Sequence, residues 1–171
     1  QYACVFDNSP GVYKSTDRGN TWTRKAVFVA NFGRASLAIC RSTPSTLALM
    51  VSYNNFLQGV FKSTDSGESW SIITANIRSL FGFDTDQLGH AQAIAIRPND
   101  PNDIFVGGVK LARSTDGGGN WFLMVDGVFQ HGDLTQLCFS EITGNDILWI
   151  CNDGGIVKYP IGGISENWNG S

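Results

Sequence analysis

The sequence predicts an all-β fold made of a repeated unit of short antiparallel strands, and three observations support this. An eight-residue motif, S-T-D-x-G-x-x-W, occurs at residues 15–22, 63–70 and 114–121, and we call each copy an octad. Successive octads lie about 50 residues apart, a period typical of one supersecondary unit stacked on its neighbours. Each octad also lies between two short apolar segments with strand character. It is therefore predicted to be the turn of a β-hairpin.

Each octad residue type suits such a turn. The aspartate can accept hydrogen bonds from backbone N–H groups a few residues later, and the glycine two positions after it supplies a positive φ. The tryptophan can pack its apolar face over the turn, and the serine hydroxyl can satisfy a remaining backbone group. The predicted structural residues are Ser15, Asp17, Gly19, Trp22, Ser63, Asp65, Gly67, Trp70, Ser114, Asp116, Gly118 and Trp121.

The octads match the Asp-box signature S/T-x-D-x-G-x-x-W, and the chain resembles Asp-box (BNR) repeat β-propellers, closest to the sortilin-like and xyloglucan-active endoglucanase branch. Residues 90–121 and the segment HGDLTQLCFSEITGNDILWICNDGGIVKY each resemble a blade of that branch. The resemblance implies one β-propeller segment of about four four-stranded antiparallel blades, approximately residues 1–30, 31–76, 88–127 and 131–171. It also implies a secreted or periplasmic protein whose Asp boxes lie on the rim away from the ligand face.

In this scheme the chain enters its first blade at the second strand, and the innermost strand is missing. The predicted strands are residues 2–6, 11–16 and 22–27; then 36–41, 46–53, 59–64 and 70–74; then 92–97, 103–107, 111–115 and 121–125; then 134–139, 147–152, 156–159 and a segment near Trp168, where the octad is degenerate. Residues 41–45 and 97–103 have turn composition and are predicted connections. A calcium site at Asp100 and Asp103 is the alternative, because clustered carboxylates suit a hard cation.

Composition excludes several classes of protein. The 171 residues are 42% hydrophobic, which favours a globular fold over a disordered one. The net charge is −3 and the 12 Lys and Arg are scattered, so no nucleic-acid partner is expected. No apolar segment reaches the ~18 to 20 residues of a membrane span. The chain does not begin with Met, and we interpret it as a mature or excised piece.

The four cysteines, Cys4, Cys40, Cys138 and Cys151, lack the spacing of a metal site. Cys138 and Cys151 are predicted on adjacent strands, where they could form a disulfide. The alternative is that the cysteines are buried free thiols acting as small apolar residues. The sequence implies neither a metal nor a cofactor.

Four blades would leave strand edges and blade faces uncovered. The chain is therefore predicted to be part of a longer chain, to form a homo-oligomer, or to close as a rare four-bladed ring. A glycan or protein ligand is expected at the loops opposite the octads, because rigid scaffolds present function on loops. These loops are predicted to display Arg24, Asn31, Arg34, Arg78, Asp84, Asp86, His90, Gln92, Asp126, His131 and Asp133 from the long connections, and Asn54, Asn55, Asn152 and Asp153 from the short ones.

Within that set, the predicted ligand-binding residues are Arg34, Arg78, Phe81, Phe83, His90 and His131. The two histidines precede the innermost strands of adjacent blades. They are therefore expected close together near the central channel, either in a polar cluster with Asp133 and Asp86 or bonded to backbone carbonyls.

The predicted function is noncatalytic recognition of, or a structural role with, glycans or proteins, because no complete catalytic constellation is visible. One alternative is a fragment of a glycoside hydrolase, which needs two carboxylates across the scissile bond. The candidate catalytic residues are Asp84, Asp86 and Asp133, with Asp126 as a further partner. A sialidase is disfavoured, since the arginines form no recognisable triad. A second alternative is a self-associating subunit of a larger assembly.

Overall fold

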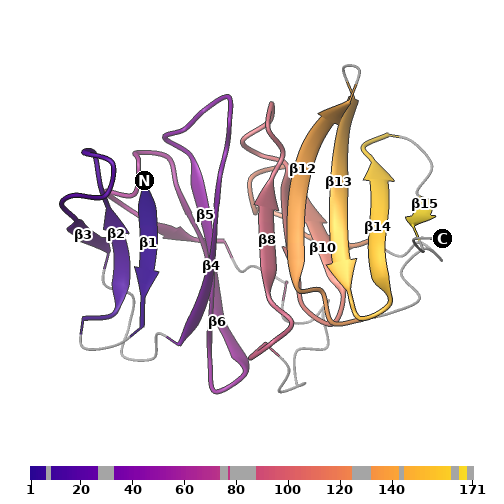
Figure 1. The fold of residues 1–171 in the computed structure, drawn as a ribbon, viewed down its shortest axis with the longest axis horizontal. Coiled ribbons are helices and arrows are strands. Elements are labelled where there is room, and N and C mark those ends of the chain that lie inside the picture. The colour runs from indigo at the N-terminus through magenta and orange to yellow at the C-terminus, as the bar shows by residue number, and fades with distance from the viewer. Residues whose placement is uncertain are drawn as a thin grey trace.

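The computed structural model describes residues 1–6, 9–26, 33–73, 77, 88–124, 132–142, 145–162 and 166–168. The strands β1 to β15 form four antiparallel sheets that follow one another along the chain and stand side by side (Figure 1). This confirms the predicted all-β fold. Among the residues that the structure describes, no helix has the length and apolar character needed to cross a membrane.

Each sheet is a meander in which consecutive strands pair. The first sheet has three strands and the other three sheets have four. The first sheet contains β1 (Tyr2–Val5), β2 (Gly11–Lys14) and β3 (Thr23–Ala26); the second β4 (Arg34–Ile39), β5 (Leu47–Tyr53), β6 (Phe56–Ser63) and β7 (Ser71–Ile72); the third β8 (Ala93–Ile96), β9 (Ile104–Gly107), β10 (Leu111–Ser114) and β11 (Phe122–Leu123); and the fourth β12 (Gln136–Ile142), β13 (Asn145–Asn152), β14 (Gly155–Pro160) and β15 (Glu166–Trp168).

The predicted strand order is correct, and the differences are at strand ends. β4 begins at Arg34, two residues earlier than predicted, and β6 begins at Phe56, three residues earlier. Phe56 pairs directly with Tyr53 across the two-residue turn Asn54–Asn55. Both asparagines have positive φ, 49° and 71°, as a tight hairpin turn of this kind requires. Asparagine tolerates this conformation better than most residues.

The core lies between neighbouring sheets. Val12 of the first sheet packs with Leu49 and Val51 of the second. A larger cluster joins the second and third sheets, and another joins the third and fourth. The first strands β4, β8 and β12 lie next to one another across these boundaries, and we call them the inner strands. The sheets are therefore held face to face by apolar burial.

The three octads form closely similar turns between the last two strands of the first three sheets. In the second octad, Asp65 Oδ1 accepts the backbone N–H of Ser69 at 2.9 Å, and Asp65 Oδ2 accepts the Ser69 hydroxyl at 2.5 Å. Ser63 Oγ donates to Asp65 Oδ1 at 2.8 Å and accepts the N–H of Gly67 at 2.9 Å. The same pattern recurs in the first octad, where Thr21 supplies the hydroxyl, and in the third, where the side-chain amide of Asn120 takes the place of the hydroxyl. The predicted hairpin turns are confirmed.

The third octad differs from the other two in the role of its tryptophan. Trp22 and Trp70 donate their indole N–H groups to the carbonyl of the glycine three residues earlier, at 3.0 Å. Trp121 instead donates to the carbonyl of Ile73 in the second sheet, at 2.8 Å. A Cβ at Gly118 would lie 2.5 Å from the Cβ of Ile73, so this turn packs tightly on the second sheet. The third octad therefore fastens two sheets together.

The hydrogen bonds of the octads lower the pKa of Asp17, Asp65 and Asp116 from 3.8 to about 2. For Asp17 and Asp65 the largest cause is the hydroxyl of the residue four positions later, followed by that residue's backbone N–H. For Asp116 the largest cause is the backbone N–H of Asn120, followed by its side-chain amide. All three turns therefore favour the ionised carboxylate.

This shift predicts a loss of stability in acid. The folded-state pKa of about 2 lies below the ordinary value of 3.8, so the contribution is complete above pH 3.8 and falls as the pH drops toward 2. We expect the triple variant D17N/D65N/D116N to have a lower melting temperature than the parent near neutral pH and a flatter pH dependence in this window. Circular dichroism melts between pH 2 and pH 6 measure both. Parallel pH profiles for parent and variant would contradict the prediction.

Candidate functional site

The ends of the strands define two faces of the sheet stack. β6 begins at the Asn54–Asn55 turn and ends at the second octad, so the turn and the octad lie at opposite ends of the second sheet. The third sheet repeats this arrangement, with a turn at residues 108–110 and an octad after β10. We call the end away from the octads the loop face and the other end the octad face.

On the loop face, three separate segments meet at the turn of the second sheet. Arg34 Nη1 donates to the carbonyl of Gly89 at 2.6 Å, and the N–H of Leu88 donates to the carbonyl of Asn55 at 3.1 Å. A Cβ at Gly89 would lie 2.2 Å from Asn55 Oδ1, so a larger residue here would force the Asn55 side chain to move. We call the surface formed by Arg34, Tyr53, Asn54, Asn55 and His90 the Tyr53 patch; all of its members are exposed except the half-buried Arg34.

A buried cluster of polar groups supports the Tyr53 patch from the interior of the protein. Gln92 is 1% exposed; its Nε2 donates to the carbonyl of Met50 at 2.9 Å, and its Oε1 accepts the hydroxyl of Ser52 at 2.6 Å. The Ser52 hydroxyl is also 3.4 Å from the carbonyl of Leu88. Gln92 was predicted as a loop-face residue that displays its side chain. That prediction is wrong, because the amide is used to tie the entry of β8 to β5.

Two predicted loop-face arginines also lie in strands. Arg24 is in β3, and its guanidinium donates to the carbonyl of Pro10. Arg34 is the first residue of β4, and its guanidinium donates a hydrogen bond to the backbone carbonyl of Gly89. For Arg34 the strand begins two residues earlier than its apolar pattern indicates, whereas Arg24 lies inside the predicted strand 22–27 and its assignment to the loop face was wrong.

Asp133, a predicted catalytic candidate, lies just before β12 beside the turn of the third sheet. The N–H of the next residue, Leu134, donates to the carbonyl of Gly108 at 2.8 Å. Asp133 has a positive φ of 58°, which is uncommon outside glycine. Among the described residues its Oδ1 is a buried side-chain oxygen with no hydrogen-bond partner. Native proteins rarely leave such an atom unpaired without a functional or structural reason.

Other predicted site residues fall outside the described residues: Asn31, Arg78, Phe81, Phe83, Asp84, Asp86, Asp126 and His131. The proximity of His90 to His131 and the carboxylate pair for glycoside hydrolysis therefore stay predictions. In the fourth sheet, Asn152 Oδ1 accepts the N–H of Gly154 at 2.9 Å within its own turn, and Asp153 is exposed.

The sequence analysis missed two aromatic residues of the loop face. Tyr53 and Phe56 flank the Asn54–Asn55 turn and are 39% and 47% exposed. The signal was present in the order Tyr-Asn-Asn-Phe, because two asparagines between strand residues favour a two-residue hairpin. Such a hairpin brings the residues on either side of it into a cross-strand pair.

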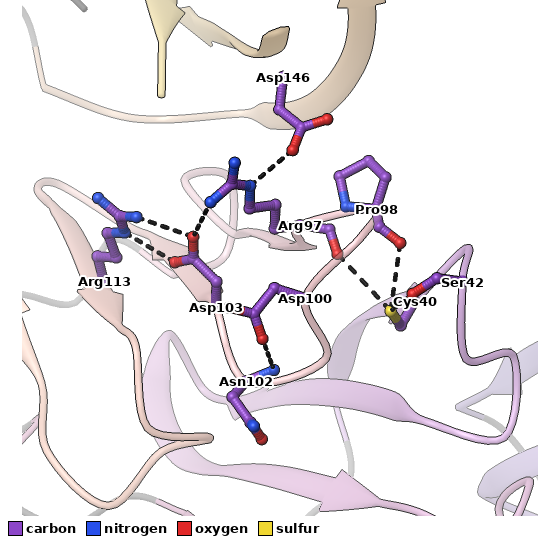
Figure 2. Close-up of polar contacts among 9 residues, drawn as sticks. All are labelled: Cys40, Ser42, Arg97, Pro98, Asp100, Asn102, Asp103, Arg113 and Asp146. Atoms are coloured by element: carbon purple, nitrogen blue, oxygen red, sulfur yellow. Dashed lines mark hydrogen bonds and ion pairs between the residues drawn. The ribbon is translucent and has the colours of Figure 1, made fainter. Parts of the chain in front are cut away.

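On the octad face, an arginine and aspartate network joins the third and fourth sheets (Figure 2). Asp103, 1% exposed, accepts both Nε and Nη2 of Arg113, at 2.7 and 2.8 Å. Arg97 Nη1 lies 3.7 Å from Asp103, and Arg97 Nε lies 2.6 Å from Asp146 of the fourth sheet. The hydrogen bonds that Arg113 donates to Asp103 are the largest cause of the raised pKa of Arg113.

This network argues against the alternative of a calcium site at Asp100 and Asp103. Both oxygens of Asp103 face guanidinium groups, and Asp100 Oδ1 accepts the N–H of Asn102 at 2.9 Å within its turn. The segment is therefore the connection that its turn composition predicts. The described residues contain no group of three or more candidate metal ligands.

The cysteines are free thiols. Cys138 pairs with Trp149 and Cys151 pairs with Gln136, so they are not cross-strand partners and the disulfide alternative is wrong. Cys40 is buried, and its Sγ lies 3.5 Å from the carbonyl of Pro98 in the third sheet (Figure 2). Burial also raises the pKa of the Cys4 thiol to about 11. Cys138 is exposed, so the buried-thiol alternative does not describe all four.

Comparison with known proteins places the fold. The structure is similar to the GH74 enzyme of Niastella koreensis (TM-score 0.66, 21% identity) and the GH74 xyloglucanase of Xanthomonas campestris (TM-score 0.65, 15% identity), with 99% of this chain covered in each case. It is also similar to YCF48 bound to D1 peptide (TM-score 0.58, 16% identity, 99% covered). The fold is thus the predicted β-propeller segment. The chain spans 28% of each GH74 chain and 51% of the YCF48 chain. No protein-family model and no curated protein matches the sequence.

The network of Figure 2 predicts that Asp103 contributes much more to the stability of the fold than its neighbour Asp100. We expect Asp103→Ala to lower the free energy of unfolding by about 3 to 5 kcal/mol, because it leaves Arg113 partly buried without its carboxylate. Asp100→Ala, the matched control, removes one hydrogen bond at a half-buried turn residue and should cost about 1 kcal/mol. Urea unfolding followed by tryptophan fluorescence measures both. Equal losses for the two variants would contradict the assignment.

Proposed function

We propose that the chain is a noncatalytic β-propeller module that binds a protein or glycan ligand through its loop face. The observation that supports this is the difference between the two faces. On the octad face, the aspartates accept hydrogen bonds from their own turns or from arginines. On the loop face, Tyr53, Asn54, Asn55 and His90 are exposed together above a rigid support. The loop face therefore brings exposed aromatic, amide and imidazole groups together on one supported surface.

The chemistry of the Tyr53 patch suits either class of ligand. Tyr53 and Phe56 offer aromatic surface, which contacts apolar side chains and sugar rings well while losing little conformational entropy on binding. The amides of Asn54 and Asn55 provide both donors and acceptors, and His90 adds a ring that can donate or accept. The YCF48 structure contains a bound peptide, which supports a polypeptide ligand, whereas the GH74 enzymes support a glycan.

We infer that the octads are Asp boxes of the BNR type, because all three share one hydrogen-bond pattern and lie on one face. A secreted or periplasmic location, suggested by the resemblance to that family, remains a proposal that fractionation of the native source would test.

The proposal predicts that binding depends on the Tyr53 patch. We expect Tyr53→Ala and His90→Ala each to weaken binding of the ligand selected from peptide and glycan arrays by about tenfold or more, as for central contact residues. Phe122→Ala is the control, because Phe122 is an exposed aromatic, 44% exposed, on the outer strand β11. Isothermal titration calorimetry measures the three affinities. Similar losses for all three variants, or none, would rule out this patch as the binding site.

A second candidate function, glycoside hydrolysis, is favoured by Asp133 on the loop face, whose Oδ1 has no hydrogen-bond partner among the residues that the structure describes. In such an enzyme Asp133 would act as one of two carboxylates across the scissile bond. This function predicts release of reducing sugar from a xyloglucan or related polysaccharide, reduced by about 100-fold or more in Asp133→Asn. Asp153→Asn is the control, because Asp153 is an exposed turn residue. Absence of any release at high protein concentration would leave the noncatalytic module as the function.

A further inference from the structure

Arg34 of the Tyr53 patch carries a positive charge that no carboxylate among the described residues neutralises. Its Nη1 donates to the carbonyl of Gly89 at 2.6 Å, and none of the ion pairs of the described residues involves its guanidinium. Arg34 is half-buried, in contrast to Arg41, which is an exposed surface arginine. Partial burial of a charge without an opposite charge costs free energy, and a carboxylate of a ligand would offset this cost.

The contact with Gly89 leaves one edge of the guanidinium open. Arginine has five N–H donors in a rigid plane. The carbonyl of Gly89 accepts one of them, from Nη1, whereas the Nε and Nη2 groups of Arg34 have no partner among the described residues. Because Gly89 restrains Nη1, the edge formed by Nε and Nη2 is presented in a restricted orientation.

A second arginine of the same protein shows what such an edge binds. Arg113 directs its Nε and Nη2 to the two oxygens of Asp103, at 2.7 and 2.8 Å (Figure 2). This two-pronged pairing with a carboxylate is one of the stronger charge-assisted contacts that arginine makes. Arg34 has the same two groups available at the loop face, so its open edge is suited to a carboxylate from another molecule.

The residues around Arg34 add donors and apolar surface to this site. His90 follows Gly89 in the sequence, and the Asn55 side chain lies against Gly89. Imidazole and amide N–H groups can donate to a carboxylate that Arg34 holds. Tyr53 is exposed and supplies an aromatic face in the same patch. No member of the Tyr53 patch is acidic, so the patch itself contains no competitor for the guanidinium.

We propose that Arg34 binds one carboxylate of a polypeptide ligand through its Nε and Nη2 groups, while Tyr53 packs against an apolar side chain next to that carboxylate. The inference rests on the loop-face proposal and names the chemical group that the Tyr53 patch recognises. The carboxylate belongs to an aspartate or glutamate side chain or to the C-terminus of the partner, since all three present the same pair of oxygens.

An acidic polysaccharide fits this site less well. Such a polymer carries carboxylates on successive sugar rings and is bound by a row of cations, whereas Arg34 is the one permanent cation of the Tyr53 patch. The net charge of −3 of the chain also opposes the approach of a polyanion. A single carboxylate flanked by apolar groups, as a polypeptide can present, matches one guanidinium beside aromatic surface.

A peptide array tests the proposal without altering the protein. Each peptide of the first set has a single aspartate among uncharged residues and an amidated C-terminus, and its partner has asparagine in place of the aspartate. A further set lacks the aspartate and has a free C-terminal carboxylate. We expect aspartate peptides, free C-termini or both to bind about tenfold or more tightly than their uncharged partners, and the comparison identifies the source of the carboxylate. Polygalacturonate, the acidic-glycan probe, should bind more weakly than the tightest peptide.

Matched variants, titrated calorimetrically with the tightest peptide, test whether Arg34 makes the contact. Arg34→Gln removes the charge, and Arg34→Lys keeps the charge but lacks the two-pronged edge. Both should weaken binding by about tenfold or more. Arg41→Gln is the control, because it removes an exposed arginine outside the patch, and it should bind as the parent does. Circular dichroism melts check the fold of each variant, and the comparison of aspartate with asparagine peptides decides the question if the Arg34 variants do not fold.

The outcomes separate this inference from the loop-face proposal on which it rests. Equal binding of aspartate and asparagine peptides and of free and amidated C-termini, lost in Tyr53→Ala, overturns the carboxylate site and keeps the loop face as a binding surface. Parent-like binding by Arg34→Lys overturns the two-pronged contact. Tighter binding of polygalacturonate than of every peptide overturns the polypeptide ligand. If no peptide or glycan binds in a way that depends on Tyr53 or Arg34, both the inference and the loop-face proposal are wrong.

Discussion

The structure depends on one interaction made three times, the acceptance by an octad aspartate of the backbone N–H and the side chain of the residue four positions later. This pair of bonds, supported by the serine two positions before the aspartate, fixes the hairpin between the last two strands of a sheet. Fixing that hairpin also fixes which ends of the strands meet at the opposite face. The octads therefore determine which strand ends and loops lie together at the loop face.

Different polar contacts join the second sheet to the third and the third sheet to the fourth. Between the second and third sheets, the indole of Trp121 bonds to Ile73, and the carbonyl of Pro98 accepts the N–H of Ser42 at 2.8 Å. Between the third and fourth sheets, Arg97 bonds to Asp146. Apolar burial supplies most of the driving force at every boundary, and these polar contacts fix the relative position of the sheets.

The sequence predicted the fold well because the octad is a local device, whose partners lie within four residues of one another. Predictions that depended on distant partners were less successful. Arg34 contacts Gly89 and Gln92 contacts Met50 and Ser52, contacts across some 40 to 55 positions of sequence that no local pattern reveals. The exposed pair of Tyr53 and Phe56 was missed because its aromatic residues look like ordinary strand residues until the turn between them is placed. The carboxylates Asp84 and Asp86 remain sequence predictions.

The contact of Trp121 with Ile73 distinguishes the third repeat from the first two, although the three octads have nearly the same sequence. A chimaera in which residues 63–70 replaced residues 114–121 would keep every octad residue type, yet its tryptophan would have to leave its own glycine carbonyl and reach across to another sheet. It would also put a glutamate where the third octad has Gly119. Shuffling, duplicating or deleting single repeats would therefore disturb the contacts between sheets, because each repeat makes contacts that are specific to its position in the chain.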